Sequence, residues 1–109
     1  MTVVDGRLLE LSSEPGEGTL RVSAAGEIDI STVDDFRAVL TDAVADGTGQ
    51  VDIDLAEITF MGSEGVRALV DARRAGQDRG VGVRVVDASK VVRTVLTLTD
   101  LEELLEEGG

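Results

Sequence analysis

The segment Gly62-Ser63-Glu64-Gly65 is the part of the sequence whose residue types could do chemistry. It places a hydroxyl beside a carboxylate, between two glycines that let the backbone approach another molecule closely. If a helix begins here, its first N–H groups form a site for an anion. The chain has no His and no Cys, so Ser63 has no imidazole base, and a thiol nucleophile or a structural zinc site is excluded. We therefore expect a binding protein, with no catalytic residue and no cofactor.

The same segment also has the pattern of an ordinary capped helix. Ser63 would be the N-cap that satisfies an N–H group of the first turn, and Glu64 would interact favourably with the helix dipole. Together these contributions are worth about 1–2 kcal/mol. Caps are common, so the pattern alone favours this structural interpretation.

The elements on either side place this segment between a strand and a helix. Val51–Leu55 alternates apolar and acidic residues, as in a strand with one buried face. A helix is predicted from Ser63 to about Arg79, with Gly80 as its stop. In α/β domains the carboxyl end of a strand before a helix is a preferred place for a binding site.

The rest of the chain supplies a hairpin, another helix and a C-terminal region. The hairpin joins strands near Arg7–Leu11 and Thr19–Ala25 through a turn-rich stretch that contains Pro15. Thr32 is the predicted N-cap of the next helix. The C-terminal region is expected to hold a strand over Val81–Val86, a short helix from Ser89 and another helix from Asp100.

These elements predict one α/β domain over residues 1–109 in the order β-β-α-β-α-β-α-α. Helical connections after the hairpin imply parallel strands, hence a mixed sheet of four to five strands. About four helices are expected mainly on one face, because the strands place polar residues on the other: Arg21, Ser23, Asp52, Asp54 and Arg84. The arginines should offset the aspartates across strands, and two carboxylates on one strand are too few to predict a metal site.

Composition excludes several classes of partner. The chain of 109 residues has a formal net charge of −12, which disfavours nucleic acid and acidic membrane surfaces. Phe36 and Phe60 are its only aromatic residues, so it has no platform for stacking bases. No segment has the roughly 20 apolar residues that span a bilayer, and the start does not resemble a signal peptide. We expect a soluble cytoplasmic protein without direct membrane insertion, either a monomer or a weak dimer.

Several segments resemble the STAS family, which comprises anti-sigma factor antagonists and the cytoplasmic domains of sulfate transporters. The run from Gly26 to Arg37, GEIDISTVDDFR, is similar to that family's G-E-L-D-x-x-T-x-x-x-L motif. Further similar segments are Val51–Leu55 with Ile58–Met61, Val66–Leu69 and Val91–Thr99. Their order and spacing cover essentially the whole chain.

The resemblance implies a regulatory loop at Gly62–Gly65. In phosphorylatable members this loop has Asp-Ser-Ser-Gly or Asp-Ser-Thr-Gly, and its second hydroxyl residue takes a phosphate from an anti-sigma factor that is itself a serine kinase. Here Ser63 matches the first hydroxyl, Glu64 occupies the phosphoacceptor position and Gly62 replaces the aspartate. A carboxylate cannot carry a stable regulatory phosphoester, so phosphorylation-controlled partner switching is expected to be lost or altered.

Three consequences of Glu64 stay open at this point. The carboxylate could partly imitate the phosphorylated state, it could face a partner adapted to it, or Ser63 could have become the acceptor, which a capping role would oppose. By the resemblance the partner-binding surface comprises Asp29, Gly62, Ser63, Glu64, Gly65, Val66 and Arg67. Asp29 has an equally good interpretation as an Asx-type turn. The expected partner is an anti-sigma factor of the serine-kinase type, in transcription regulation; the alternative is a STAS-like subunit of a transport or signalling assembly.

Overall fold

A mixed β-sheet forms the centre of the molecule. The computed structural model describes residues 2–3, 9–46 and 49–105. Its strands lie in the order β1-β2-β3-β4-β5. They are β1 (Thr2–Val3), β2 (Leu9–Pro15), β3 (Thr19–Ile28), β4 (Gln50–Met61) and β5 (Gly82–Ala88). β2 is antiparallel to β1 and β3, whereas β3, β4 and β5 are parallel. The predicted α/β class with a mixed sheet is confirmed.

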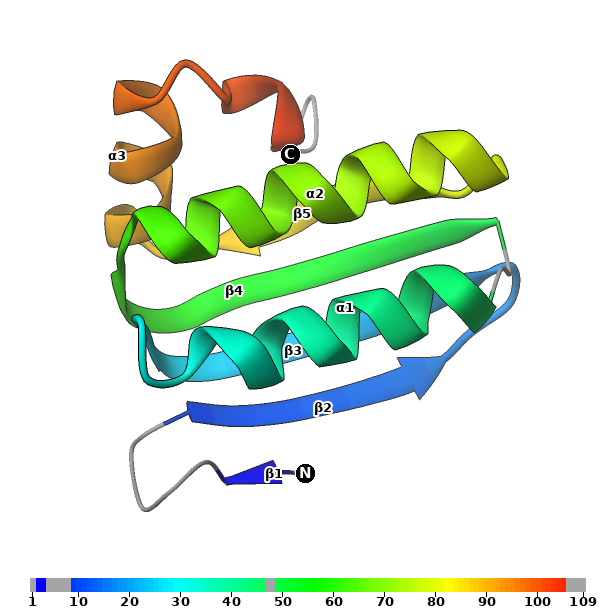
Figure 1. The fold of residues 1–109 in the computed structure, drawn as a ribbon, viewed down its shortest axis with the longest axis horizontal. Helices are drawn as coiled ribbons and strands as arrows, with labels where there is room; N and C mark the ends of the chain where they lie inside the picture. The colour runs from blue at the N-terminus through cyan, green and yellow to red at the C-terminus, as the bar shows by residue number, and fades with distance from the viewer. Residues whose placement is uncertain (1, 4–8, 47–48, 106–109) are drawn as a thin grey trace.

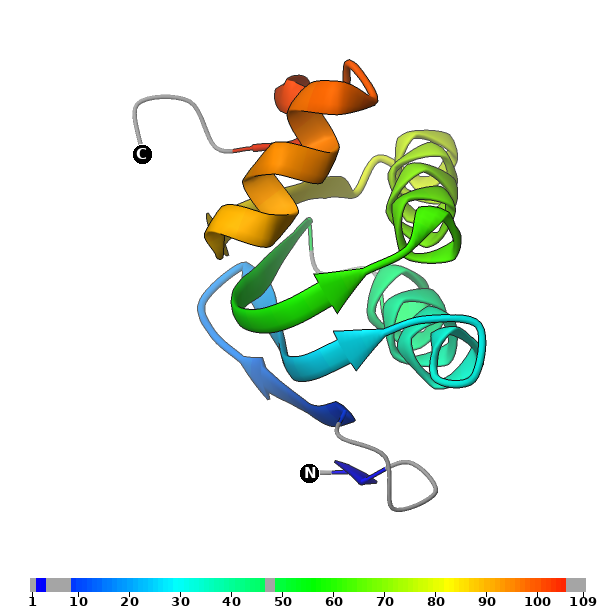
Figure 2. The same ribbon diagram turned by 90° about the vertical axis from the view of Figure 1, so that its left-hand side faces the viewer.

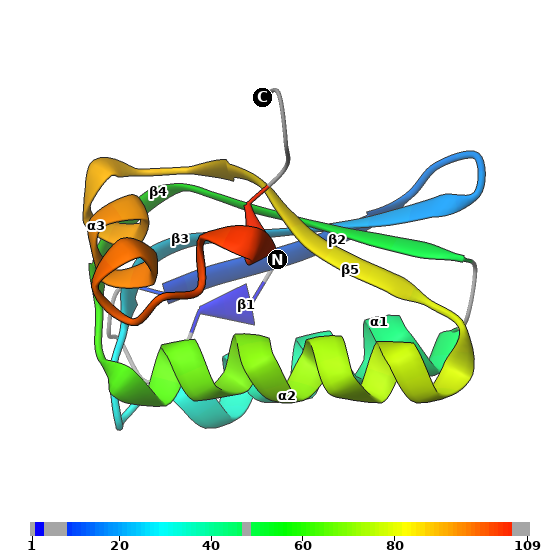
Figure 3. The ribbon, with the colours of Figure 1, turned by 90° about the horizontal axis from the view of Figure 1, so that it is seen from above.

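Two long helices cover one face of this sheet. α1 (Val33–Asp46) and α2 (Ser63–Arg79) lie side by side on the same face (Figures 1 and 2). α3 (Lys90–Leu98) packs against β4 and β5 at the end of the sheet where β4 leads into α2 (Figure 3). In the described part of the chain, none of the helices is long and apolar enough to cross a lipid bilayer.

The core follows the periodicity of the sequence. In β4 the side chains of Val51, Ile53 and Leu55 are fully buried, and the acids between them are half-buried. α1 contributes Phe36 and Leu40, which are buried one helical turn apart. Buried apolar residues of α1, α2 and α3 thus pack against the apolar face of the strands. This packing holds the helices that carry the candidate site in position.

Ion pairs join the strands on the opposite face of the sheet. An Arg21 Nη atom lies 2.8 Å from Asp54 Oδ2, and Arg84 Nε lies 3.2 Å from Asp52 Oδ1. The prediction that these arginines offset the aspartates is confirmed. The pairs are partly exposed, so each contributes about 0–1 kcal/mol. Among the described residues there is no cluster of three or more potential metal ligands.

The predicted fourth helix, from Asp100, is wrong. Asp100 has a φ of 61°, which a helix does not allow, and only a 3₁₀ turn, η1 (Glu102–Leu104), follows it. Leu105 then forms a parallel bridge with Val85. The end of the described chain thereby covers part of the outer edge of β5, which would otherwise present unpaired backbone groups.

The N-terminal hairpin and β4 are longer than predicted. Residues 12–15 were assigned to a turn by their composition but pair with β3 as far as Pro15↔Leu20. Ser13, Glu14 and Pro15 are exposed in succession, so this end of β2 buries neither face and its pairing does not need alternating apolar residues. Of the first predicted strand, Arg7 and Leu8 lie outside the described residues, and a further strand, β1, precedes it. β4 runs to Met61, six residues beyond its predicted end.

The bounds of α2 and the start of α3 agree with the prediction from the sequence. α2 spans residues 63–79 as predicted, and Gly80 ends it in the left-handed conformation with a φ of 73°. Ser89 is the N-cap of α3, where its hydroxyl accepts a hydrogen bond from Val92 N at 3.3 Å.

Candidate functional site

The start of α2 is fixed to the ends of two neighbouring parallel strands. Gly62 N donates a 2.9 Å hydrogen bond to Ile28 O, the carbonyl of the last residue of β3. Met61, the last residue of β4, pairs with Ile28 in the sheet. The turn from β3 into α1 and the turn from β4 into α2 therefore lie next to each other, at the carboxyl ends of two neighbouring parallel strands.

Gly62, not Ser63, is the N-cap of α2. Gly62 has an extended backbone, with φ −85° and ψ 177°, and its carbonyl accepts from Gly65 N at 3.0 Å. Ser63 is already the first helical residue. Its side chain is exposed, and its hydroxyl forms no hydrogen bond with any described residue. The predicted cap at Ser63 is wrong because the chain enters the helix one residue earlier, and the hydroxyl forms no capping bond with the first-turn N–H groups.

The Glu64 side chain folds back toward the helix start. A Cβ placed on Gly62 would lie only 2.7 Å from Glu64 Oε1, so the carboxylate occupies the space that a side chain at position 62 would need. Glu64 is half-buried and lines a shallow depression of about 310 Å³ together with Ser63, Arg67 and the first turns of α1. Within the described residues the carboxylate forms no ion pair. The depression also contains Asp34 and Arg37, so its wall carries charges of both signs.

Gly65 and Val66 belong to the packing of the helix rather than to its accessible surface. A Cβ on Gly65 would lie 2.8 Å from Ile28 Cγ2 and 2.9 Å from Met61 Cγ, so only glycine lets α2 come this close to the strand ends. Val66 is only 7% exposed. Both residues were expected on the partner surface, but they are buried. They pack the first turn of α2 and so hold Ser63 and Glu64 in position.

Arg67 is exposed one turn into α2 and borders two depressions. One is shared with α1, and the other, of about 480 Å³, is lined by Arg74 and by Thr99 after α3. Among the described residues Arg67 has no carboxylate partner. Its guanidinium is free to bind an acid from outside the molecule.

Asp29 forms the predicted Asx-type turn. Its Oδ1 accepts hydrogen bonds from Ser31 N at 2.9 Å and Ser31 Oγ at 2.6 Å. The Thr32 hydroxyl was expected to cap α1, but it donates to Glu27 O at 2.9 Å and accepts from Asp29 N at 3.0 Å. Thr32 is 1% exposed, so these bonds hold the turn rigidly beside the start of α2.

Sequence reasoning missed the exposed apolar side chains around this site. Ile30 is 78% exposed in the Asp29 turn, and Phe60 is 49% exposed, with its Cε2 3.6 Å from where a Gly62 Cβ would be. Leu98, 80% exposed, directly precedes Thr99. A signal existed for Leu98, which falls outside the buried Val92–Leu96 stripe of its helix.

The comparison with known protein families decides the assignment. The family model described as "Mlab, STAS domain" matches residues 11–106, which is most of the chain. The chain belongs to the STAS domain family. The predicted resemblance to this family is thereby confirmed, and the matched residues include the turn after β3 and the start of α2.

Individual relatives of this STAS domain include anti-sigma factor antagonists. An anti-sigma-B factor antagonist of Staphylococcus epidermidis is 26% identical over 84 residues, which cover 77% of this chain and 78% of the relative. The crystal structure of an anti-sigma factor antagonist from Mycobacterium paratuberculosis superposes with a TM-score of 0.84 at 26% identity, covering 96% and 91% of the two chains. The phosphorylated form of the Bacillus cell fate determinant SpoIIAA gives a TM-score of 0.69 at 20% identity, covering 90% and 88%, and shows the shared fold.

Proposed function

We propose that this STAS domain is a non-enzymatic protein-interaction module of the anti-sigma factor antagonist type. Its partner would be an anti-sigma factor of the serine-kinase type in the cytoplasm, bound by a monomer or weak dimer. The binding surface, called here the α2 N-terminal surface, comprises Asp29, Ile30, Phe60, Ser63, Glu64 and Arg67. The similarity to named antagonists supports the class of partner.

One observation carries the proposed docking site: apolar side chains are exposed beside the start of α2. Ile30 lies in the turn after β3 and Phe60 lies near the end of β4, on either side of the hydrogen bond from Gly62 to Ile28, in a chain with a net charge of −12. Exposed apolar residues grouped with a polar rim are typical of protein–protein interfaces. Ser63 and Arg67 provide that rim, and the hydrogen-bonded turns around them hold the surface in one shape before binding.

Glu64 supports loss of the phosphate switch at its position. A glutamate carries a charge of about −1, where phosphoserine carries about −1.5 to −2 and presents three acceptor oxygens. The folded-back position of Glu64, against Gly62, supports a partner adapted to this carboxylate over an imitation of an outward-facing phosphate. We propose a complex that persists when ATP is present.

Ser63 is the hydroxyl in this segment that a kinase could still reach. The capping bond that would have opposed its modification is absent, since Gly62 is the N-cap and the Ser63 side chain is exposed. Modification of Ser63 would place a phosphate at the positive end of α2, which helix electrostatics favours. The measurement of phosphorylation must therefore distinguish Ser63 from any change at position 64.

The docking site is tested by mixing the protein with kinase-type anti-sigma factors in ADP and measuring affinity by calorimetry. Ile30→Ser and Arg67→Glu should each weaken binding at least about tenfold, because they remove an interface anchor or reverse a rim charge. Gln77→Ser, an exposed substitution at the far end of α2, is the matched control. Binding by none of these kinases, or equal weakening by the control, would contradict the proposal.

A second candidate is a STAS-like subunit of a transport or signalling assembly without a phosphorylation cycle. The observation that favours it is Glu64 itself, since an assembly subunit needs no acceptor at this position. Stable co-purification with a membrane transporter or scaffold, unaffected by ATP, would support this candidate. Binding to a soluble anti-sigma kinase through the α2 N-terminal surface would exclude it.

A further inference from the structure

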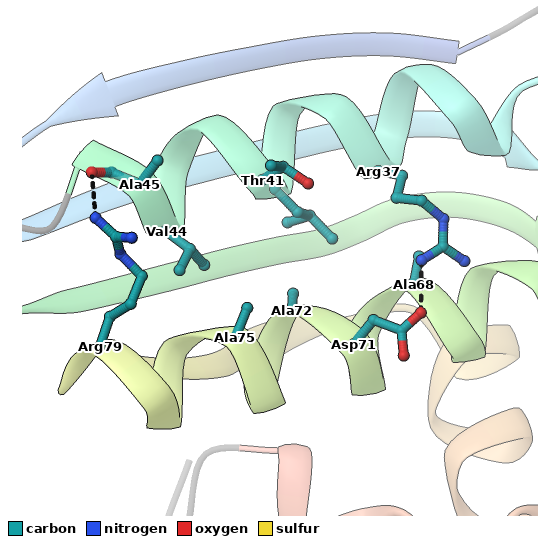
Figure 4. A pocket seen from close by; sticks show the side chains of 10 residues that line it. Arg37, Thr41, Val44, Ala45, Ala68, Asp71, Ala72, Ala75 and Arg79 are labelled. Carbon is teal, nitrogen blue, oxygen red and sulfur yellow. Dashed lines mark hydrogen bonds and ion pairs between the residues drawn. The ribbon is translucent and has the colours of Figure 1, made fainter.

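A groove runs between α1 and α2, from Arg37, which also borders the depression beside Glu64, to Arg79 at the end of α2. It has a volume of about 340 Å³. Its floor is formed by the buried side chains of Leu40, Val44, Ala68 and Ala72, and Ala75 lies on its rim. Figure 4 shows Val44, Ala68, Ala72 and Ala75 along the space between the two helices.

An arginine reaches across each end of the groove from opposite helices (Figure 4). Arg37 of α1 pairs with Asp71 of α2 at 2.7 Å, so the charges at that end satisfy each other. Arg79 of α2 instead donates one long hydrogen bond, 3.4 Å, to Ala45 O at the end of α1. Arg79 has no ion pair with any described carboxylate, and a guanidinium has five donors, so most of its capacity is unused.

The dimensions favour a slender linear occupant. Residues 71 and 79 are eight positions apart on α2, which corresponds to about 12 Å along the helix. A partner helix of about 10 Å diameter could place only part of one face in a space of about 340 Å³, whereas an extended alkyl chain could lie along it. A volume of about 340 Å³ falls instead at the lower end of small-molecule pockets, which are mostly apolar with a few polar groups that fix orientation.

We propose that this groove binds a medium-chain carboxylate, such as a free fatty acid. The carboxylate would accept two hydrogen bonds from the Arg79 guanidinium, and the alkyl chain would lie along the alanine floor toward the Arg37–Asp71 pair. The orientation is one-way, because Asp71 already satisfies Arg37 and repels a second carboxylate there. This inference does not depend on the proposed function, since none of the residues that define the α2 N-terminal surface lines the groove.

The experiment titrates isotope-labelled protein with sodium decanoate, below its aggregation concentration, and follows the backbone amides of Thr41, Ala45, Ala72 and Ala75 by NMR. Decyltrimethylammonium, with the opposite charge, is the comparison ligand. Because the protein has a net charge of −12, non-specific binding would favour the cationic compound. We expect saturable shifts at the groove with decanoate and at least about tenfold weaker binding of the cation.

Matched variants test the two parts of the site. Arg79→Gln should weaken decanoate binding at least about tenfold, whereas Arg74→Gln, which removes an exposed arginine of the same helix outside the groove, should leave it unchanged. Ala75→Leu should abolish binding by filling the groove, and Gln77→Leu is its control. The proposal would be overturned by amide shifts confined to residues outside the groove, by stronger binding of the cation, or by equal effects of variants and controls.

Discussion

Substitutions at Gly62 and Glu64 should have coupled effects on stability, because the Glu64 carboxylate fills the space beside Gly62. Glu64 Oε1 would lie 2.7 Å from a Cβ at position 62. Gly62→Asp therefore brings a second carboxylate against the first. Two such charges about 4 Å apart repel by about 1 kcal/mol in water and more in a half-buried site. Asp improves on Gly as an N-cap by only a few tenths of a kcal/mol. Gly62→Asp alone should thus destabilise the protein by about 1 kcal/mol.

The sign of this effect should reverse when Glu64 is removed. In the Glu64→Ser background the space beside position 62 is open, and its extended backbone suits an aspartate N-cap. Gly62→Asp should then stabilise by a few tenths of a kcal/mol, which gives a coupling energy of about 1 kcal/mol. The assay is urea denaturation of the four proteins of this double-mutant cycle at low salt.

Salt provides the internal control for this cycle. If the coupling is charge repulsion, 1 M NaCl should reduce it strongly, because the screening length then falls to about 3 Å. Stabilities that add within about 0.3 kcal/mol at low salt would refute the coupling. A coupling that does not change with salt would show that steric exclusion, not charge, links the two positions.

Three further predictions concern the scaffold. Gly76→Ala should destabilise the protein by about 1–2 kcal/mol, because its Cβ would clash with Val81 O; this outweighs a gain in helix propensity of about 1 kcal/mol. The melting temperature should fall by about 4–9 °C. A rise would contradict the close packing of α2 on β5. Arg21→Ala should change the free energy of unfolding by less than about 1 kcal/mol, since its ion pair with Asp54 is partly exposed. A larger loss of stability in urea denaturation would contradict this small contribution. Leu104→Ala should cost about 2–5 kcal/mol, because this side chain is 1% exposed; an effect under 1 kcal/mol in the same assay would mean that η1 is not part of the core.

Much of the fold could be predicted because periodicity and stop signals coincide. The alternation in Val51–Leu55 predicts β4, although not its continuation to Met61, and Gly80 predicts where α2 ends. The helix expected from Asp100 could not be excluded by periodicity, because Leu101, Leu104 and Leu105 are spaced as in a helix. A contact between distant parts of the chain determines the structure of this segment, because Leu105 pairs with Val85 at the edge of the sheet.

The sequence predicts where α2 starts but not the atomic detail of the candidate site at that start. Ser-Glu after a glycine allows either residue 62 or residue 63 to be the N-cap, and the hydrogen bond from Gly62 N to Ile28 O, which fixes where the helix starts, joins residues far apart in the chain. The exposure of Ile30 and Phe60 likewise depends on how the turn after β3 lies against the end of β4. Local pattern predicts what each segment is, whereas the shared surface arises only when β3 and β4 lie in parallel.

The affinity for a kinase-type anti-sigma factor in ATP, relative to ADP, tests the central claim most directly when intact mass is recorded on the same samples. The wild-type protein should bind with nearly equal affinity in both nucleotides and keep its unmodified mass, because position 64 cannot take a phosphate. Glu64→Ser should gain one phosphate in ATP and then dissociate. A wild-type complex that ATP disrupts, with a phosphate found on Ser63, would contradict the claim that the switch at this surface has been lost.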